Sequence, residues 1–239
     1  MQDQTNRHRW LAMVVSVAAL LAAGTSASAA EYVDSYKGTP FVDSHHAKDA
    51  QKIPGRIEIA AYDNGGEGIA YHDVDPQNHG SGELNPANGS YLNEFRKGDG
   101  GDTSYTKFHI TPDAIDDNPF DVVQPPADQL YLGWTEPGEW VNITVDVAEA
   151  GTYSGDLLYT SNRGGTISVD VNGQDATGAL SVISTNDSAD PVAWRQWHHW
   201  NLATSLVRLH LAKGKNVLTV HVLTGGNMNL AYLDFRKVA

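Results

Sequence analysis

Three tryptophans in the C-terminal third of the chain are the residues whose type and spacing most clearly indicate a chemistry. Trp194, Trp197 and Trp200 recur every three residues. On an extended strand an odd spacing places neighbouring side chains on opposite faces, so the three rings cannot all belong to one core. Trp194 follows a segment that contains Pro191, and we expect its ring to be the exposed one. An exposed indole offers a large, flat, apolar surface that suits the C–H face of a sugar ring.

Side-chain amides would complete such a site, because a sugar ring also carries a rim of hydroxyl groups. An amide both donates and accepts hydrogen bonds, and concave binding sites commonly join an apolar surface to a few polar groups. Asn227 and Asn229 follow the Gly225-Gly226 pair, and the two could exchange this role. The structural alternative for Asn229 is a residue that caps the turn after the glycines.

The sequence lacks the patterns of common catalytic sites. It contains no cysteine, which excludes disulfides, a thiolate zinc site, a cysteine nucleophile and a lipoprotein anchor. Gly-x-Ser-x-Gly, His-Glu-x-x-His and glycine-rich phosphate loops are also missing. Glycoside hydrolysis needs a pair of carboxylates, but among 29 acidic residues some pair is always present, so its presence carries no information. We interpret the adjacent His45 and His46 as solvated rather than metal-binding.

Short β-strands are the elements that must position these residues. Apolar and polar residues alternate with the period of a half-buried strand. The clearest runs are residues 141–147, 153–159, 167–171 and 218–222. Turn sequences such as Pro137-Gly138, Asn172-Gly173 and Lys213-Gly214 separate the runs. This pattern predicts an all-β protein, folded as a β-sandwich jelly roll.

Two long stretches, residues 73–129 and 184–193, do not follow the strand period. Long irregular segments inside a compact domain are uncommon and tend to be functional. We therefore expect the functional site to use one of them.

The first thirty residues have the features of a secretory signal peptide. Residues 7–9 are basic, residues 10–23 are mostly apolar, and Ala27-Ser28-Ala29 is a small-residue cleavage site. The apolar run is short for a membrane span, and an uncleaved anchor is the alternative. Residues 31–55 are polar and aperiodic, which indicates an N-terminal extension across the domain surface. The remaining residues, 56–239, form the single predicted domain, in a secreted or periplasmic protein.

Several short motifs follow one another along residues 57–235. In chain order they are Ile57-Glu58-Ile59, Tyr62-Asp63-Asn64-Gly65-Gly66-Glu67-Gly68, Ala70-Tyr71-His72-Asp73, Gly138-Glu139-Trp140, Ala150-Gly151-Thr152-Tyr153, Trp194-x-x-Trp197, Leu211-Ala212-Lys213-Gly214-Lys215 and Asn229-Leu230-x-Tyr232. This ordered set resembles carbohydrate-binding module family six, although no single motif is specific. The chain departs from that pattern at Ala60, where the family has a second Glu, and in its two long irregular segments.

The resemblance implies a galactose-binding-like β-sandwich that binds polysaccharide without cleaving it. In such modules a cleft among the loops at one end holds a sugar ring between a Tyr and a Trp, and an Asn binds the hydroxyls. Carried over, the Trp is Trp194 and the Asn is Asn229. Tyr91 is our choice for the second aromatic residue, with Phe95 as its substitute. Trp197 matches the tryptophan that is structural in the family, and we expect it in the core.

The resemblance also implies a structural calcium ion that joins the first and last strands. Its carboxylate ligands would be Glu58 and Asp234, helped by backbone carbonyls. Calcium takes about six to eight oxygen ligands, and Ala60 removes one of those expected. The alternative is that Glu58 is a plain edge-strand charge. A second acidic cluster comprises Asp73, Asp75 and Glu83. We interpret it as a solvated loop rather than a calcium site.

The expected function is a secreted, non-catalytic module that binds a polysaccharide or oligosaccharide. The alternatives are a small all-β glycoside hydrolase or polysaccharide lyase, and a lectin-like adhesin. The net charge of −13 argues against nucleic acid or an anionic membrane as the partner, because both need a basic surface. The same charge disfavours strongly sulfated polysaccharides. We expect a monomer.

Overall fold

A computed structural model describes residues 29–45, 49–106, 116 and 118–238 of the 239-residue chain. The chain divides into a unit of residues 1–36 and a unit of residues 37–239. Within the first unit, residues 29–35 form a short helix. The predicted signal peptide lies almost wholly outside the described residues. In the described part, no helix is long and apolar enough to cross a membrane.

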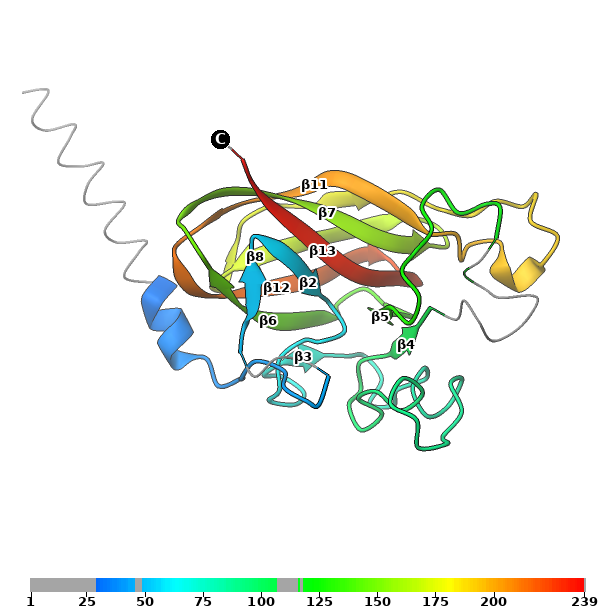
Figure 1. Cartoon of the computed structure of the whole chain (residues 1–239), viewed down its shortest axis with the longest axis horizontal. Coiled ribbons are helices and arrows are strands. Elements are labelled where there is room, and N and C mark those ends of the chain that lie inside the picture. The colour runs from blue at the N-terminus through cyan, green and yellow to red at the C-terminus, as the bar shows by residue number, and fades with distance from the viewer. Residues whose placement is uncertain (1–28, 46–48, 107–115, 117, 239) are drawn as a thin grey trace, which may run out of the picture. The chain divides into compact units, whose positions relative to one another are not determined.

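The second unit is a sandwich of two β-sheets (Figure 1). The first sheet has seven strands in the order β1-β6-β12-β8-β10, with β3 beside β6 and β9 beside β8. Its strands are β1 (Gln51–Ile53), β3 (Tyr71–His72), β6 (Trp140–Val147), β8 (Gly165–Val171), β9 (Gln174–Asp175), β10 (Leu180–Val182) and β12 (Gly214–Gly225). The pairing of β1 with β6 is parallel, unlike the other pairings of this sheet.

The second sheet has six strands in the order β11-β7-β13-β5-β4, with β2 beside β13. Its strands are β2 (Gly55–Glu58), β4 (Thr103–Tyr105), β5 (Leu130–Leu132), β7 (Gly151–Ser161), β11 (Asn201–Leu211) and β13 (Met228–Val238). All of its pairings are antiparallel. The edge strand β11 contains a bulge between Ala203 and Val207, where Ser205 has a left-handed φ of 54°. The prediction of an all-β sandwich is confirmed.

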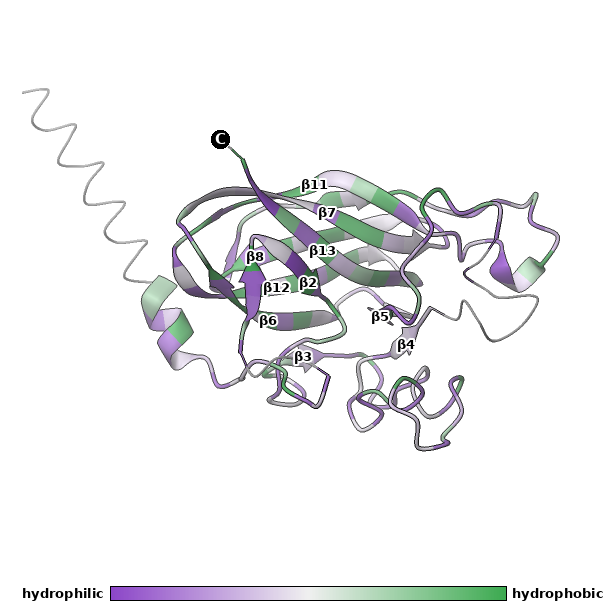
Figure 2. Ribbon diagram, in the orientation of Figure 1, coloured by the Kyte–Doolittle hydropathy of each residue, from purple (hydrophilic) through white to green (hydrophobic). Residues whose placement is uncertain are grey.

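The main core lies between the two sheets and comes directly from the alternating sequence. On β6, the side chains of Val141, Ile143, Val145 and Val147 are at most 3% exposed. Figure 2 shows the same alternation of hydrophobic and hydrophilic residues along β13. Burying one such aliphatic side chain stabilises the fold by about 1.5–3 kcal/mol. The register of each strand is therefore fixed, because a shift by one residue would expose its whole apolar face.

A smaller cluster packs on the outer face of the six-stranded sheet. Its members are Tyr131, Leu158, Trp200, Ala231 and Tyr232. The segment around residues 118–123 is bonded to this cluster, since the backbone N–H groups of Val122 and Val123 donate to the Trp200 carbonyl at 2.9 and 3.1 Å. Part of the predicted irregular stretch thus lies against the sheet instead of forming a free loop.

Two predicted boundaries differ from the structure. Strand β1 lies inside the predicted N-terminal extension, and Thr39 forms an isolated bridge with Asn64. The sandwich unit therefore begins before residue 56, because this mostly polar segment pairs with β6 and buries Ile53 in the main core. Strand β4 lies inside the stretch 73–129 that was predicted as irregular, and β5 directly follows it. They have three residues each, too few to show a strand period.

The long connection between β3 and β4 is fixed to the sandwich by Arg96, whose side chain is 4% exposed. Its guanidinium donates to the carbonyls of Tyr62 and Asp63 at 2.7 and 3.0 Å and to Asp99 at 2.8 Å. It also lies 3.6 Å from the centre of the Tyr62 ring. These contacts make residues 73–102 an ordered part of the fold.

Candidate functional site

Four connections between strands are hydrogen-bonded to one another at one end of the sandwich. The backbone N–H of Thr185 donates to the Ser161 carbonyl at 2.8 Å, which joins the β10–β11 connection to the end of β7. Asn162 donates to Asn227 at 3.2 Å, and Asn227 donates to Thr135 at 2.7 Å. Loops of the two sheets therefore meet here, as a loop-end binding site requires.

Trp194 lies on this end, in the short 3-10 turn Ala193–Arg195 within the β10–β11 connection. Its side chain is 57% exposed. Every other aromatic residue that the structure describes is buried or half-buried. The exposed position of Trp194 agrees with the prediction from the sequence.

The turn that carries Trp194 is built around the carboxylate of Asp190, which is 0% exposed. Oδ1 accepts from the Val192 N–H and from Arg195 Nη2, both at 2.9 Å. Oδ2 accepts from Arg195 Nε at 2.7 Å and lies 2.9 Å from His199 Nε2. The Arg195 hydrogen bonds hold the pKa of Asp190 well below its usual range, so the carboxylate is ionised.

Asn229 is buried, which does not suit the sugar-binding role that was predicted for it. It is 2% exposed, and its Nδ2 donates to Thr160 Oγ1 at 2.9 Å. Its Oδ1 lies so close to Gly133 that a Cβ added there would be only 2.8 Å away. The physical reason is register: Asn229 pairs with Thr160 inside the six-stranded sheet, so its amide serves the sheet and not a ligand.

Tyr91 also differs from its predicted role as the second aromatic surface. It is half-buried, with its hydroxyl donating to Asp43 at 2.6 Å. The His45 ring stacks on it at 3.7 Å, and Phe95, the suggested substitute, packs edge-on at 5.6 Å. Phe95 itself is 3% exposed. A sugar could stack on Tyr91 only after His45 had moved.

The core tryptophan of the C-terminal triplet is Trp200, not Trp197 as expected. Trp200 is 0% exposed, whereas Trp197 is half-buried. As the three-residue spacing predicts, the rings have different environments. The buried ring, Trp200, lies in the cluster on the outer face of the six-stranded sheet and not in the main core. That cluster exists because residues 118–123 cover this face, which the strand period could not reveal.

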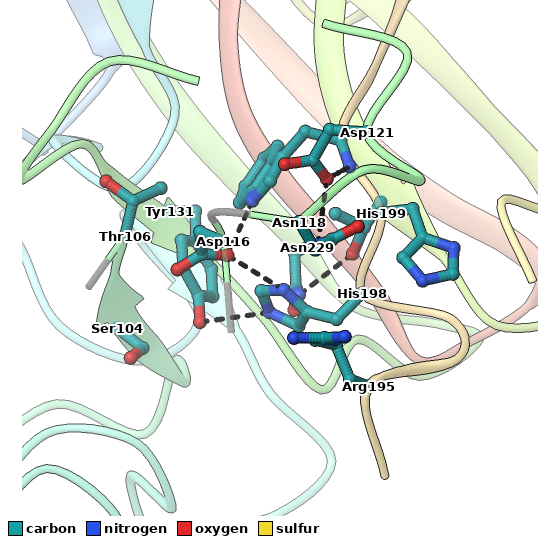
Figure 3. A network of polar contacts seen from close by, with 12 residues as sticks. Ser104, Thr106, Asp116, Asn118, Asp121, Tyr131, Arg195, His198, His199 and Asn229 are labelled. Atoms are coloured by element: carbon teal, nitrogen blue, oxygen red, sulfur yellow. Dashed lines mark hydrogen bonds and ion pairs between the residues drawn. The ribbon is translucent and has the colours of Figure 1, made fainter. Parts of the chain in front are cut away.

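A buried polar network braces the segment after Trp194 (Figure 3). The indole N–H of Trp200 donates to Asp116 at 2.6 Å, and His198 Nδ1 lies 2.9 Å from the same carboxylate. On its other side, His198 Nε2 lies 3.4 Å from the Tyr131 hydroxyl. Asp121 accepts from the Trp200 backbone N–H at 2.9 Å, and burial raises the pKa of Asp121 to about 6. With His198 only 2% exposed, the network supports the loop rather than meeting a ligand.

Asp190, Arg195, His198 and His199, which anchor the segment around Trp194, were not predicted from the sequence. Their spacing of five, three and one residues matches no recognised motif. The available signal was the concentration of charged and aromatic residues in a segment that does not follow the strand period.

The structure places a positively charged side chain near the two predicted calcium ligands. Tyr232 lies opposite Glu58, and Asp234 lies opposite Arg56, on the paired strands β2 and β13. Glu58 and Asp234 are therefore diagonal neighbours on the two strands, and so are Arg56 and Tyr232. The Arg56 guanidinium lies 3.8 Å from the centre of the Tyr232 ring. The register puts Arg56 on the same face of the strand pair as both carboxylates, and its positive charge disfavours a divalent cation there. Among the described residues, no group of three or more acidic or histidine side chains is arranged to hold a metal.

The second acidic cluster already has a basic side chain within it. His79 lies with Nδ1 3.1 Å from Glu83 and Nε2 3.6 Å from Asp75. The hydrogen bond to Glu83 raises the pKa of His79. Asp73 accepts the backbone N–H of Asp75 at 2.9 Å. These carboxylates therefore organise the loop on their own.

A hollow of about 440 Å³ lies in the same connection between β3 and β4. Its lining contains polar side chains and small residues, but no aromatic ring. Gln77 donates to Glu83 at 2.5 Å, and Lys97 pairs with Glu94. Because many of its polar groups already have hydrogen-bond partners and no flat apolar surface is present, this hollow suits a sugar less well than the surface around Trp194.

Comparison with known proteins gives no match by sequence: no protein-family model matches, and no curated protein matches. The structure is similar to carbohydrate-binding modules. A family 6 module of Clostridium stercorarium solved with cellobiose has 12% identity and a TM-score of 0.44, covering 80% of this chain and 100% of that one. Another family 6 module has 12% identity and a TM-score of 0.43, covering 79% and 98%. A family 35 module of Clostridium thermocellum has 20% identity and a TM-score of 0.38, covering 49% and 84%. At such low scores the similarity carries no functional argument.

Proposed function

We propose that this protein is a secreted, non-catalytic module that binds polysaccharide by stacking a sugar ring on Trp194. The observation that carries the proposal is a 57% exposed indole on a turn anchored by a buried carboxylate. A large apolar ring in water favours a partner that covers it. A neutral sugar fits this requirement, because its C–H face covers the ring while its hydroxyls stay hydrated.

For the sugar hydroxyls we propose Asn227 in place of the buried Asn229. Asn227 is half-buried at the same loop end and has a left-handed φ of 54°. Its backbone is held by Thr135 and Asn162. Within the part of the chain that the structure describes, the hydrogen bonds of Asn227 involve only its backbone. Its amide can therefore donate to and accept from a ligand.

The proposal of secretion rests on the sequence of the first thirty residues, with their basic start, apolar run and Ala27-Ser28-Ala29. Expression of the full chain with its own N-terminus tests it. A product that begins near residue 30 outside the cytoplasm supports the proposal. A full-length product retained inside the cell contradicts it.

Electrophoresis in native gels that contain xylan, β-1,3-glucan, agarose or a sulfated algal polymer tests the binding function. We expect retardation by at least one uncharged polymer, and its loss in Trp194→Ala. Leu84→Ala is the matched control, because Leu84 is a comparably exposed apolar residue, at 59%, in the β3–β4 connection. Normal retardation of Trp194→Ala would contradict the proposed site.

The same panel separates the proposed function from the alternatives. Release of reducing ends from any polymer would show a hydrolase, and formation of unsaturated ends would show a lyase. Agglutination of cells, with no retardation by soluble polymers, would indicate an adhesin.

A further inference from the structure

Asp190 lies at the centre of an unusually well-anchored surface turn. Its carboxylate receives four contacts from Val192, Arg195 and His199 between 2.7 and 2.9 Å. Its backbone carbonyl also accepts from Gln196 Nε2 at 3.1 Å. A fully buried carboxylate is stable only when paired and hydrogen-bonded, and a two-point contact from an arginine fixes the geometry as well as the charge.

The anchoring continues from Asp190 to two other parts of the fold. His199 Nδ1 lies 2.9 Å from the Thr185 carbonyl, while its Nε2 faces Asp190. The His199 ring stacks on Phe120 at 5.2 Å, with the two planes 24° apart. Thr185 is itself bonded to the end of β7. The turn is therefore connected through side chains both to the sandwich and to the segment that packs over Trp200.

We propose that Asp190, Arg195 and His199 form a clamp that holds Trp194 in the orientation required for sugar stacking. The proposal rests on the proposed function and names positioning residues for the same site. Trp194 lies between Val192 and Arg195, and both of these bond to the Asp190 carboxylate. The backbone before Trp194 and the side chain after it are thus held by one buried carboxylate, while the Trp194 ring remains exposed.

Such a clamp strengthens binding without touching the sugar. A loop and a ring that are already ordered lose little conformational freedom when a ligand binds, and this cost otherwise weakens affinity. Breaking the clamp should therefore weaken binding by roughly three- to tenfold, even though every atom of Trp194 is still present.

The first experiment measures the clamp without any sugar. The protein is labelled with 5-fluorotryptophan, and the Trp194 resonance is assigned by its absence from Trp194→Phe. We expect one narrow resonance in the unmodified sequence and a shifted or broadened one in Asp190→Asn. Arg195→Lys is the second variant, since it keeps the positive charge but loses the two-point contact, and it covers the case in which Asp190→Asn does not fold.

Asp187→Asn is the matched control for both variants. Asp187 is exposed in the same turn, and its Oδ1 accepts the Ala189 N–H at 2.9 Å, a bond that Asn can also accept. The chemical change is the same as in Asp190→Asn, but the clamp is intact. We expect the Trp194 resonance and the affinity to stay unchanged. A Trp194 resonance that is unaltered in folded Asp190→Asn or Arg195→Lys overturns the clamp.

The second experiment compares affinities for the best polysaccharide in a double-mutant cycle. Arg195→Lys should weaken binding in the unmodified sequence but have a smaller effect in the Trp194→Phe background, because both changes act on the same contact. Equal effects in the two backgrounds would show that Arg195 acts independently of Trp194 and would overturn the proposal. If no polymer binds while the fluorine resonance responds as expected, the proposed function fails and the clamp as a structural device stands.

Discussion

At the scale of single residues, Trp194 and Trp200 show that identical side chains six positions apart can have opposite environments. One ring is 57% exposed and the other is 0% exposed. The difference arises because Trp194 lies in an exposed turn. Trp200 directly precedes β11 and is covered by residues 118–123. Substitutions at the two positions should therefore affect different properties of the protein.

Trp194→Ala should remove most polysaccharide binding and leave the fold intact. Aromatic stacking on a flat ring contributes about 1–3 kcal/mol, which corresponds to a tenfold to hundredfold loss of affinity. The melting temperature should hardly change, because an exposed ring loses little contact in the free protein. Titration calorimetry and thermal unfolding on the same preparation check both parts. A melting temperature lowered by several degrees with unchanged affinity would contradict the assignment.

Trp200→Ala should have the opposite effect. Truncating a fully buried tryptophan leaves a cavity and costs about 3–5 kcal/mol of stability, and here it also leaves Asp116 without its indole donor. The free energy of unfolding in denaturant measures this loss. Trp197→Ala is the comparison, and its smaller destabilisation should reflect its half-buried ring. An equal or larger loss of stability in Trp197→Ala would contradict the assignment of Trp200 as the core tryptophan of the triplet.

At the scale of secondary-structure elements, the sequence was informative where residues alternate and uninformative where register or a covering segment decides. The apolar face of β6 follows from Val141 to Val147, and the exposure of Trp194 follows from its spacing and the preceding proline. The burial of Asn229 depends on its pairing with Thr160, far away in the chain. The cover over Tyr91 likewise depends on His45, from a segment with no recognisable period.

The pairing of β2 with β13 leads to a prediction about calcium. Because Arg56 lies over Tyr232, on the same face of the strand pair as Glu58 and Asp234, we expect no calcium ion at these two carboxylates. Addition of a chelator to the protein as purified should leave the melting temperature unchanged, and Asp234→Asn should change stability by less than about 0.5 kcal/mol. Calorimetry with and without calcium measures both. A calcium-dependent rise in melting temperature that Asp234→Asn abolishes would show that the ion displaces Arg56.

At the scale of the whole molecule, the excess of acidic residues includes several that are buried. Burial raises the pKa of Glu139 from 4.5 to about 8 and that of Asp102 from 3.8 to about 6. Asp102 accepts the backbone N–H of His79, and Glu139 accepts that of Glu136. These carboxyl groups bind a proton more tightly in the folded than in the unfolded chain. Their contribution to stability is therefore fully present below the unfolded pKa and is lost as pH rises through the folded pKa.

Glu139→Gln should test this relation. Each pKa unit corresponds to about 1.4 kcal/mol, so removal of the Glu139 charge should stabilise the protein by up to a few kcal/mol at high pH. The amide oxygen of Gln can still accept the Glu136 N–H. We expect the variant and the original protein to unfold at similar temperatures at pH 4.5, with the variant more stable at pH 8.5. Parallel melting curves across this range would contradict the raised pKa of Glu139.

The bulge in β11 has a consequence for self-association. An eleven-residue strand at the edge of a sheet would normally offer a continuous row of backbone groups to another chain. Here the ladder is interrupted between Ala203 and Val207, where the Ser205 N–H turns towards Asp156 at 2.6 Å. The other terminal strands of the two sheets, β1, β4 and β10, have only three residues each. None of the four edges in the described part of the chain gives a second copy a long template, so we expect a single species of about 25.8 kDa or less in sedimentation velocity even at high concentration.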